Sequence, residues 1–447
     1  MVGKGTLLII LGFSLIFGLA SQYWNRTSTE ATENFVDYYD STAAHNIAVS
    51  AANIAADSIF HDPSNTHLNW SGSFSGGTYS FSSEWNVVDG DSDVLVTAIG
   101  TYPAMYGNIV DTVQVLLSPC PFDRYAFFSN DENSTYWITG DTLTGPLHTN
   151  GTLYVSGVPV IKGSATSLNG TDPAKLPDTN GDTLKCTSYQ SGVNIPIPSS
   201  LTATENAASK VFSNTDTYSR DTYDVYLTFN ADGTVTYHTT TVTYPVVSGR
   251  RRKTTVTTQD STVAVSTFAP SGVALVVNGD VHVQGVLDGE ITVAAEQGVG
   301  SSSTNWGAIS LPNYITPPVK NGNVLIDGSI TYKNNPQNGP STDMLGLVAD
   351  NSVMLTTQST QNMTIDGAIF AKSGEFLYQN YNGGSPMGYL DLYGAITNNI
   401  RGAVGTFSGH TLQTGYNKDY VYDSRFATTA PPFFPTTGQF QILAWRE

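Results

Sequence analysis

The chain has 447 residues, a formal net charge of −18 and only 13% charged residues. Because an acidic chain repels phosphate backbones, we expect no nucleic-acid partner. The length is sufficient for two or three domains with cores of their own, and the wealth of serine, threonine, asparagine and glycine is typical of an extracellular β-rich surface protein.

An apolar segment opens the chain. It follows Lys4 and Gly5 and continues without charge to Trp24, before the first arginine, Arg26. About twenty apolar residues at a rise of 1.5 Å span roughly 30 Å, the hydrocarbon thickness of a bilayer. Aromatic residues next to a basic residue, here Tyr23 and Trp24 before Arg26, are typical of a membrane interface. The segment is therefore predicted to be a transmembrane helix.

The helical pattern continues beyond this segment. Apolar residues recur mostly at spacings of three or four from Phe35 to Ile59, with acidic residues between them, which is the period of an amphipathic helix. No proline precedes Pro63, which provides a stop. We predict one hydrophobic and then amphipathic helix over residues 6–62.

A basic residue, a glycine, a hydrophobic rod and an amphipathic extension that leads into a β domain together resemble the type IV pilin superfamily. In that family a dedicated peptidase cuts after the glycine, here Gly5, so that residues 1–5 are a leader and Thr6 is the first mature residue. The resemblance implies a prepilin whose helix lies in the inner membrane before assembly and then packs with copies of itself or other pilin subunits. The usual glutamate at the fifth mature position is replaced by Ile10, which is more typical of specialised minor subunits.

Two other interpretations of the N-terminal segment stay open. An ordinary signal peptide would be cut after the small residues Gly18 and Ala20, although the helical pattern continues well past that point. An uncleaved membrane anchor would keep Met1.

Residues 66–118 alternate with period two. Four runs bounded by turn residues predict an antiparallel sheet, and Asp89-Gly90-Asp91 predicts a hairpin between the middle two. The four runs are residues 77–81, 84–88, 94–100 and 112–117. In pilin-like domains such a sheet covers one face of the helix, and this helix has an apolar stripe to bury.

The middle region, residues 122–270, reads as short strands separated by glycine, proline and asparagine. A polar insertion is expected over residues 164–222, followed by a hairpin of residues 225–229 against 235–237. Residues 145–151, Gly-Pro-Leu-His-Thr-Asn-Gly, resemble a signature of large pilin-like proteins with β-helical C-terminal parts.

Residues 271–447 contain similar units, each a short alternating strand, a Gly/Asn/Asp corner and another strand. Units that recur at about twenty to thirty residues predict the coils of a parallel β-helix, in which each rung buries its inward row against the next. An antiparallel sandwich is the alternative. Residues 341–349, 414–426 and 431–435 also resemble segments of the same pilin-like proteins. The predicted fold class is mainly β with one long N-terminal α-helix: a pilin-like helix plus antiparallel sheet, followed by a β-rich, parallel β-helix domain.

Catalytic signatures are missing from the sequence. It has no nucleophile elbow, phosphate-binding loop or His-Glu-x-x-His motif, and no cysteine pair at zinc spacing. We therefore expect no enzymatic activity; a β-helical polysaccharide-active enzyme, whose carboxylates escape a motif search, is the enzyme alternative. Cys120 and Cys186 are a disulfide candidate in an oxidising exterior, with two buried free thiols as the alternative.

One loop has the spacing of a calcium site, and calcium is the one cofactor that the sequence suggests. Asp178, Asn180 and Asp182 place three oxygen ligands at alternate positions, as calcium loops do. The acidic residue expected at position twelve is replaced by Tyr189, and a turn built of turn-forming residues is the simpler interpretation.

Four of the 19 basic residues are consecutive: Arg250, Arg251, Arg252 and Lys253. A solvated hairpin tip is the default interpretation. The functional alternative is an interaction site for another acidic copy of this chain or for an anionic cell-surface polymer.

These features predict a structural subunit of an extracellular type IV pilus-like filament at the cell surface. It assembles through its hydrophobic helix and displays a β-rich domain for cell adhesion or surface contact. The alternative is a membrane-anchored monomeric surface adhesin or glycan-binding β-helix protein, with cell-surface glycans as partners.

Overall fold

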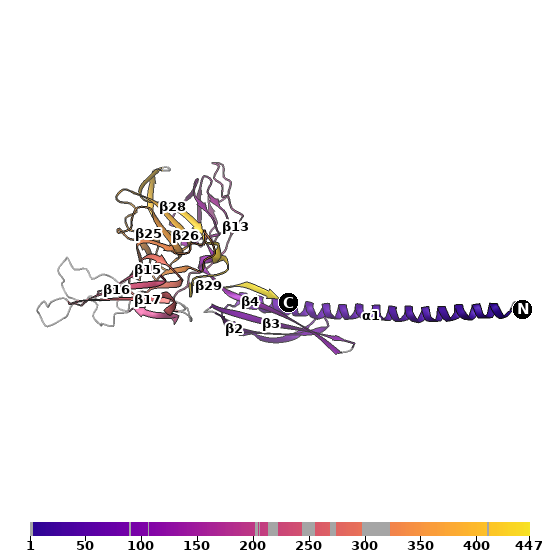
Figure 1. Ribbon diagram of the computed structural model, residues 1–447. Helices are drawn as coiled ribbons and strands as arrows, with labels where there is room; N and C mark the ends of the chain where they lie inside the picture. Colours follow the sequence, from indigo (N-terminus) through magenta and orange to yellow (C-terminus); the bar gives the residue numbers. More distant parts are fainter. Residues whose placement is uncertain are drawn as a thin grey trace. The chain divides into compact units, whose positions relative to one another are not determined.

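A computed structural model provides the fold (Figure 1). It describes residues 3–88, 91–105, 107–201, 204, 206–212, 222–243, 255–268, 274–296, 322–408 and 411–447. The chain forms two compact units. Unit 1 consists of residues 1–87, 92–118 and 439–447, and unit 2 consists of residues 88–91 and 119–438.

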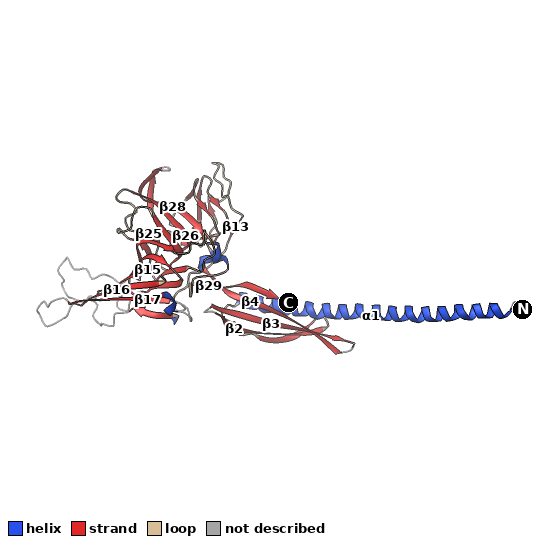
Figure 2. Cartoon of the chain, in the orientation of Figure 1, coloured by secondary structure: helices blue, strands red, loops and turns tan. Residues whose placement is uncertain are grey.

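Unit 1 contains one long helix and one five-stranded sheet (Figures 1 and 2). The strands are ordered β1-β2-β3-β4-β29, and β1–β2 and β3–β4 pair antiparallel. The elements are α1 (Gly3–His61), β1 (Asn69–Phe74), β2 (Gly77–Val88), β3 (Asp91–Ala104), β4 (Gly107–Pro121) and β29 (Thr436–Arg446).

The C-terminal third of α1 packs on the sheet. Its buried face is almost entirely alanine, which lets the helix backbone approach the strands closely. At Gly100 in β3, an added Cβ would lie 2.3 Å from the carbonyl oxygen of Ala44 and 2.4 Å from the nitrogen of Ala48. The core between helix and sheet consists of Ala48, Ala51, Ala52, Ala55, Ala56 and Ile59 with Phe81, Val94, Val96, Ala98, Val113, Val115 and Leu117.

The single helix and the antiparallel sheet are confirmed, and in the full chain the helix also includes residues 3–5 of the predicted leader. Two predictions for unit 1 were wrong. The runs 77–81 and 84–88 are one strand, β2, because Ser82 stays extended and pairs with Asn69 of the unpredicted strand β1. The sheet also includes β29, which the sequence placed in the C-terminal domain. Residues 89 and 90 of the expected hairpin lie outside the described residues.

Unit 2 is almost entirely short strands (Figure 2). Those of its N-terminal part are β5 (Phe127–Asp131), β6 (Trp137–Ile138), β7 (Thr142–Leu143), β8 (Leu147–Thr149), β9 (Leu153–Ser156), β10 (Val160–Ile161), β11 (Ser164–Ser167), β12 (Thr171–Asp172), β13 (Ser188–Ser191), β14 (Ala208–Phe212), β15 (Thr222–Asn230), β16 (Thr234–Thr243) and β17 (Thr255–Ala264).

The later strands are longer on average. They are β18 (Ala274–Asn278), β19 (Val281–Leu287), β20 (Glu290–Glu296), β21 (Val324–Tyr332), β22 (Met344–Ala349), β23 (Val353–Leu355), β24 (Met363–Ala371), β25 (Phe376–Tyr378), β26 (Pro386–Ile400), β27 (Gly405–Ser408) and β28 (Thr411–Tyr422), with short 3-10 helices at Phe122–Arg124, Val265–Phe268 and Ser424–Ala427.

Parallel ladders connect these strands. The longest runs β14-β18-β20-β22-β24-β26-β5-β8-β11-β13. A second runs β15-β19-β21-β23-β25, and a third joins parts of β19, β21, β24, β26 and β28. Among the described strands of unit 2, antiparallel pairing is confined to β15–β16–β17, which contains the predicted hairpin, and β27–β28. The described strands of unit 2 therefore pair mostly in parallel, which is the pairing that coils require.

Aligned apolar residues form the core of unit 2. Eight of the ten strands in the longest ladder, from β18 to β11, each contribute one buried side chain in register with the next, so the row continues from strand to strand. The aligned residues are Leu275, Val293, Leu347, Ile369, Ile396, Phe127, Leu147 and Ala165.

The predicted domains 122–270 and 271–447 are in fact parts of one unit. The ladder passes directly from β26 to β5, where Ile396 pairs with Phe127. The region 164–222, expected to be a polar insertion, contributes β11 and β13 to the same ladder. This junction between strands distant in sequence was not predicted, because a period-two pattern does not identify a strand's partner.

Candidate functional site

The N-terminal part of α1 is uncovered by the rest of unit 1 (Figure 1). The described part of the chain has one helix long and apolar enough to cross a membrane, and its most apolar 18-residue window has a mean hydropathy of 1.8 and no buried residue. Gly5 and Thr6, the predicted processing residues, lie within this exposed helix. The large exposed side chains are Leu7, Leu8, Ile9, Ile10, Leu11, Phe13, Leu15, Ile16, Phe17, Leu19, Tyr23 and Trp24.

The exposed apolar surface extends past the membrane-length segment. Phe35 is 70% exposed and Tyr38 is 71% exposed. At 1.5 Å per residue, Phe35 lies about 16 Å beyond Trp24 along the helix. A bilayer that covers the first segment therefore leaves these two rings outside its hydrocarbon core.

The other predicted site residues are dispersed. Cys120 and Cys186 are both free cysteines, so the structure contains no disulfide between them. The basic residues 250–253 lie outside the described residues.

The calcium loop is folded as a turn. Asp178 accepts backbone hydrogen bonds from Asn180 (2.9 Å) and Asp182 (2.8 Å), and Asp182 accepts one from Gly157 (2.6 Å). The carboxylates thus already have donors within the protein, as the turn interpretation requires. No group of three or more His, Cys, Asp or Glu residues suited to a metal occurs among the residues that the structure describes. Calcium binding stays a prediction.

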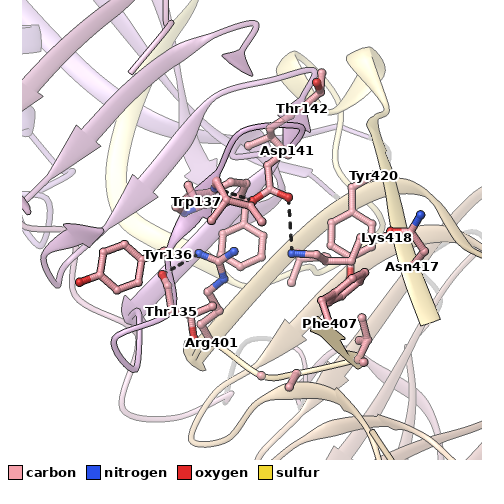
Figure 3. Close-up of a pocket in the computed structure, with 18 of the residues that line it drawn as sticks. Thr135, Tyr136, Trp137, Asp141, Thr142, Arg401, Phe407, Asn417, Lys418 and Tyr420 are labelled. Atoms are coloured by element: carbon pink, nitrogen blue, oxygen red, sulfur yellow. Dashed lines mark hydrogen bonds and ion pairs between the residues drawn. The ribbon is translucent and has the colours of Figure 1, made fainter. Parts of the chain in front are cut away.

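A cavity of about 410 Å³ lies in unit 2 beside the junction of β26 and β5 (Figure 3). One wall comes from the segment after β5, and the other comes from β26, the turn that follows it, and β28. The labelled lining residues are Thr135, Tyr136, Trp137, Asp141, Thr142, Arg401, Phe407, Asn417, Lys418 and Tyr420.

Arg401 is fixed by a buried ion pair. Its Nη1 donates to Glu132 Oε2 at 2.6 Å, and the two side chains are 5% and 0% exposed. The same nitrogen donates to the carbonyl oxygen of Thr135 at 3.2 Å, and the guanidinium carbon lies 4.2 Å from the ring centroid of Trp137. Glu132 also accepts hydrogen bonds from Ser129 and from the Trp137 indole. Because the pair joins residues 269 positions apart, it ties β26 to the segment after β5.

Lys418 is held more loosely. Its ammonium lies 3.9 Å from Asp141 Oδ1, while Asp141 Oδ2 accepts a hydrogen bond from the backbone of Ile138 at 2.9 Å. Burial lowers the pKa of Lys418, and the positive charge of Arg401 lowers it further. Figure 3 shows both cationic side chains among the lining residues, Arg401 from the turn after β26 and Lys418 from β28.

Buried carboxyls form a separate cluster near the third 3-10 helix. Asp423 is fully buried and pairs with Arg425 at 2.6 Å, and it also accepts a hydrogen bond from Tyr393. Asp366, 1% exposed, accepts a hydrogen bond from the backbone nitrogen of Tyr332 at 2.9 Å. Burial, followed by the charge of Asp423, raises the pKa of Asp366 to about 6.

Sequence reasoning missed the cavity residues entirely. Arg401 and Lys418 belong to no motif, and their partners Glu132 and Asp141 lie more than 260 residues earlier. The sequence offered one general signal: basic residues are scarce in this acidic chain, so each of them is a candidate for a specific role. Their burial, which singles out Arg401 and Lys418, is visible only in the structure.

Comparison with known proteins gives little further guidance. No family model and no curated protein matches this chain. A solved structure that is similar to it is the competence-associated pilin ComZ from Thermus thermophilus, with 12% identity, coverage of 91% of this chain and 97% of that chain, and a TM-score of 0.34. Since a TM-score this low does not establish a shared fold, the proposals below rest on the helix, the ladders and the cavity themselves.

Proposed function

We propose that this chain is a structural subunit of an extracellular type IV pilus-like filament, inserted in the inner membrane before assembly and held in the filament by its N-terminal helix. In this proposal the parallel ladders of unit 2 are the coils of a β-helix displayed at the cell surface for adhesion or surface contact. Assembly requires no catalytic group in the chain.

The apolar helix supports insertion into a membrane or a bundle of helices. Each large apolar side chain gains about 1.5–3 kcal/mol on burial. The ten from Leu7 to Leu19 are each about 60–70% exposed, so their exposure to water costs on the order of 15 kcal/mol. Lipid or neighbouring helices would remove that cost.

The observation that carries the filament proposal is the pair of exposed rings on Phe35 and Tyr38. They lie on the same continuous helix, beyond the reach of the hydrocarbon core and before the first residues that pack on the sheet. A simple membrane anchor leaves these rings in water, whereas helices packed side by side in a filament cover them.

The first experiment is the mass of the N-terminal peptide from protein sheared off intact cells. A peptide that starts at Thr6 supports pilin-type processing after Gly5. A start at Ser21 means ordinary secretion without the rod, and a protein that keeps Met1 and does not shear is a membrane anchor; either result rejects the proposal.

A pair of variants tests the packing of the helix. The double substitution Phe35→Ser and Tyr38→Ser should abolish filaments while membrane insertion persists, because the residues up to Trp24 are unchanged. The matched control is Trp70→Ser, which alters a 65% exposed ring on β1 and should leave filaments intact. Filaments of normal length from the double variant would contradict side-by-side packing at this position.

The basic residues 250–253 are a further proposed interaction site for acidic copies of the same chain. At −18 per chain, subunits repel one another unless cations or basic groups intervene. Charge reversal at these four residues should weaken assembly in a salt-dependent way, and equal assembly at low and high salt would count against the site.

A further inference from the structure

The cavity beside the β26–β5 junction is accessible from solvent. Thr135, Tyr136 and Phe407 on its lining are exposed, with Tyr136 at 44% and Phe407 at 39%. Its volume of about 410 Å³ falls within the range of small-molecule sites, which are mostly apolar with a few convergent polar groups. A ligand of one or two sugar rings fits this size.

Lys418 presents unused hydrogen-bond donors to the cavity. An ammonium has three N–H donors, yet the described residues offer Lys418 one ion pair at 3.9 Å and no hydrogen bond. Asp141 is a weak partner, since one of its oxygens is already committed to the backbone of Ile138. A partly buried ammonium in this state gains most from an anionic acceptor.

Arg401 strengthens the preference for an anion. Glu132 holds its guanidinium in place through Nη1, so the group is positioned before any ligand arrives. Arg401 and Lys418 both line the cavity (Figure 3), and they lie close enough for the positive charge of Arg401 to lower the pKa of Lys418, so the two positive charges repel. A carboxylate between them would remove the repulsion and accept hydrogen bonds from both.

The rest of the lining suits a polar ring rather than a fatty chain. Phe407 and Tyr420 offer aromatic surface for the C–H face of a sugar, and both lie near Lys418 in Figure 3. Asn417 and Thr142 offer an amide and a hydroxyl for its hydroxyl groups. The cavity lining therefore contains both aromatic rings and hydrogen-bonding groups besides the two cations.

We propose that this cavity binds a saccharide unit that carries a carboxylate, of the uronic-acid type, with the carboxylate between Lys418 and Arg401. The inference goes beyond the filament role and does not depend on it, because the cavity lies within unit 2 and is complete in one copy of the chain.

The test uses the full chain, purified in detergent, and saturation-transfer NMR titrations with D-glucuronate, D-glucose and acetate. Glucuronate should bind about tenfold or more tightly than either of the others, because only it offers both the ring and the carboxylate. Equal binding of glucose would overturn the role of the cations, and equal binding of acetate would overturn the role of the ring. No binding of glucuronate at about 10 mM, far above the dissociation constant of a specific site, would overturn the site itself.

Two variants locate the binding. Lys418→Met keeps the length of the side chain and removes the ammonium, and it should weaken glucuronate binding about tenfold or more. Lys333→Met is the control, since it removes an ammonium that pairs with Asp288 outside the cavity lining, and its binding should be unchanged. If Lys418→Met does not fold, Phe407→Ser, which alters a 39% exposed ring on the lining, should weaken binding instead. Unchanged glucuronate binding in a folded Lys418→Met protein would overturn the proposal. A chain that binds glucuronate but forms no filaments would contradict the proposed filament role and leave this site in place.

Discussion

Removing one partner of the buried Arg401–Glu132 pair should destabilise unit 2 strongly. In Arg401→Met, Glu132 loses its ion-pair partner while it stays fully buried with the Ser129 and Trp137 donors. Breaking a buried pair from one side costs about 3–5 kcal/mol, because the remaining charge is left uncompensated. We expect a loss of this size, with a further small loss of the cation–π contact between Arg401 and Trp137.

The double variant Arg401→Met and Glu132→Gln isolates the pair from the rest of the packing. Because neither residue then leaves an unpaired buried charge, the double variant should lose less unfolding free energy than the sum of the two single variants, by about 2 kcal/mol or more. The exposed pair of Lys333 and Asp288, with side chains 44% and 28% exposed, is the control. Lys333→Met should cost less than about 1 kcal/mol.

Pulse proteolysis in urea measures these differences on the full chain, because cleavage reports the unfolded fraction at each urea concentration. If Arg401→Met costs no more than Lys333→Met, or if the single-variant losses simply add in the double variant, the buried pair is not what joins β26 to the segment after β5.

Three further predictions follow from other parts of the chain. Gly100→Ala should destabilise unit 1 by about 3 kcal/mol or more, since its Cβ would meet the backbone of Ala44 and Ala48, and a thermal melt equal to the wild type would contradict this close approach. Asp366 has a folded-state pKa of about 6, above the value of about 3.9 in an unfolded chain. The folded state therefore binds this proton more tightly, so its contribution makes the protein more stable by up to about 3 kcal/mol as pH falls from 7 through 6 toward 4; Asp366→Asn should flatten that part of the profile, and an identical profile in the variant would refute the assignment. If the loop of Asp178, Asn180 and Asp182 binds calcium, a chelator should lower the melting temperature of the wild type but not of Asp178→Ala, and no effect on the wild type would rule the site out.

The spacing of apolar and turn-forming residues predicted the elements whose formation depends on neighbouring residues in the chain. The spacing of apolar residues in α1 and the turn between β15 and β16 are properties of short windows, and both are present as expected. The sequence also favoured parallel pairing over an antiparallel sandwich, because the repeated units have no helical crossovers between them, and most described strands of unit 2 do pair in parallel.

Partner choice between distant strands could not be predicted in the same way. Nothing around Phe127 specifies that its neighbour is Ile396, and nothing in β29 specifies the sheet of unit 1. The cavity depends on the first of these pairings, since Arg401 and Lys418 reach Trp137 and Asp141 only after β26 lies beside β5. The residues that line the cavity could therefore not be identified from the sequence without knowing this pairing.

The order of the strands in the sequence determines when each strand can pair during synthesis. β5 emerges early in synthesis but must wait for β26, and β4 must wait for β29, so both have an unpaired edge until the last part of the chain has been made. Unpaired edges recruit other strands, and such long-range closure is slow. During synthesis the chain therefore passes through an interval in which these strand edges can pair with other chains, and a chaperone that covers them would protect it.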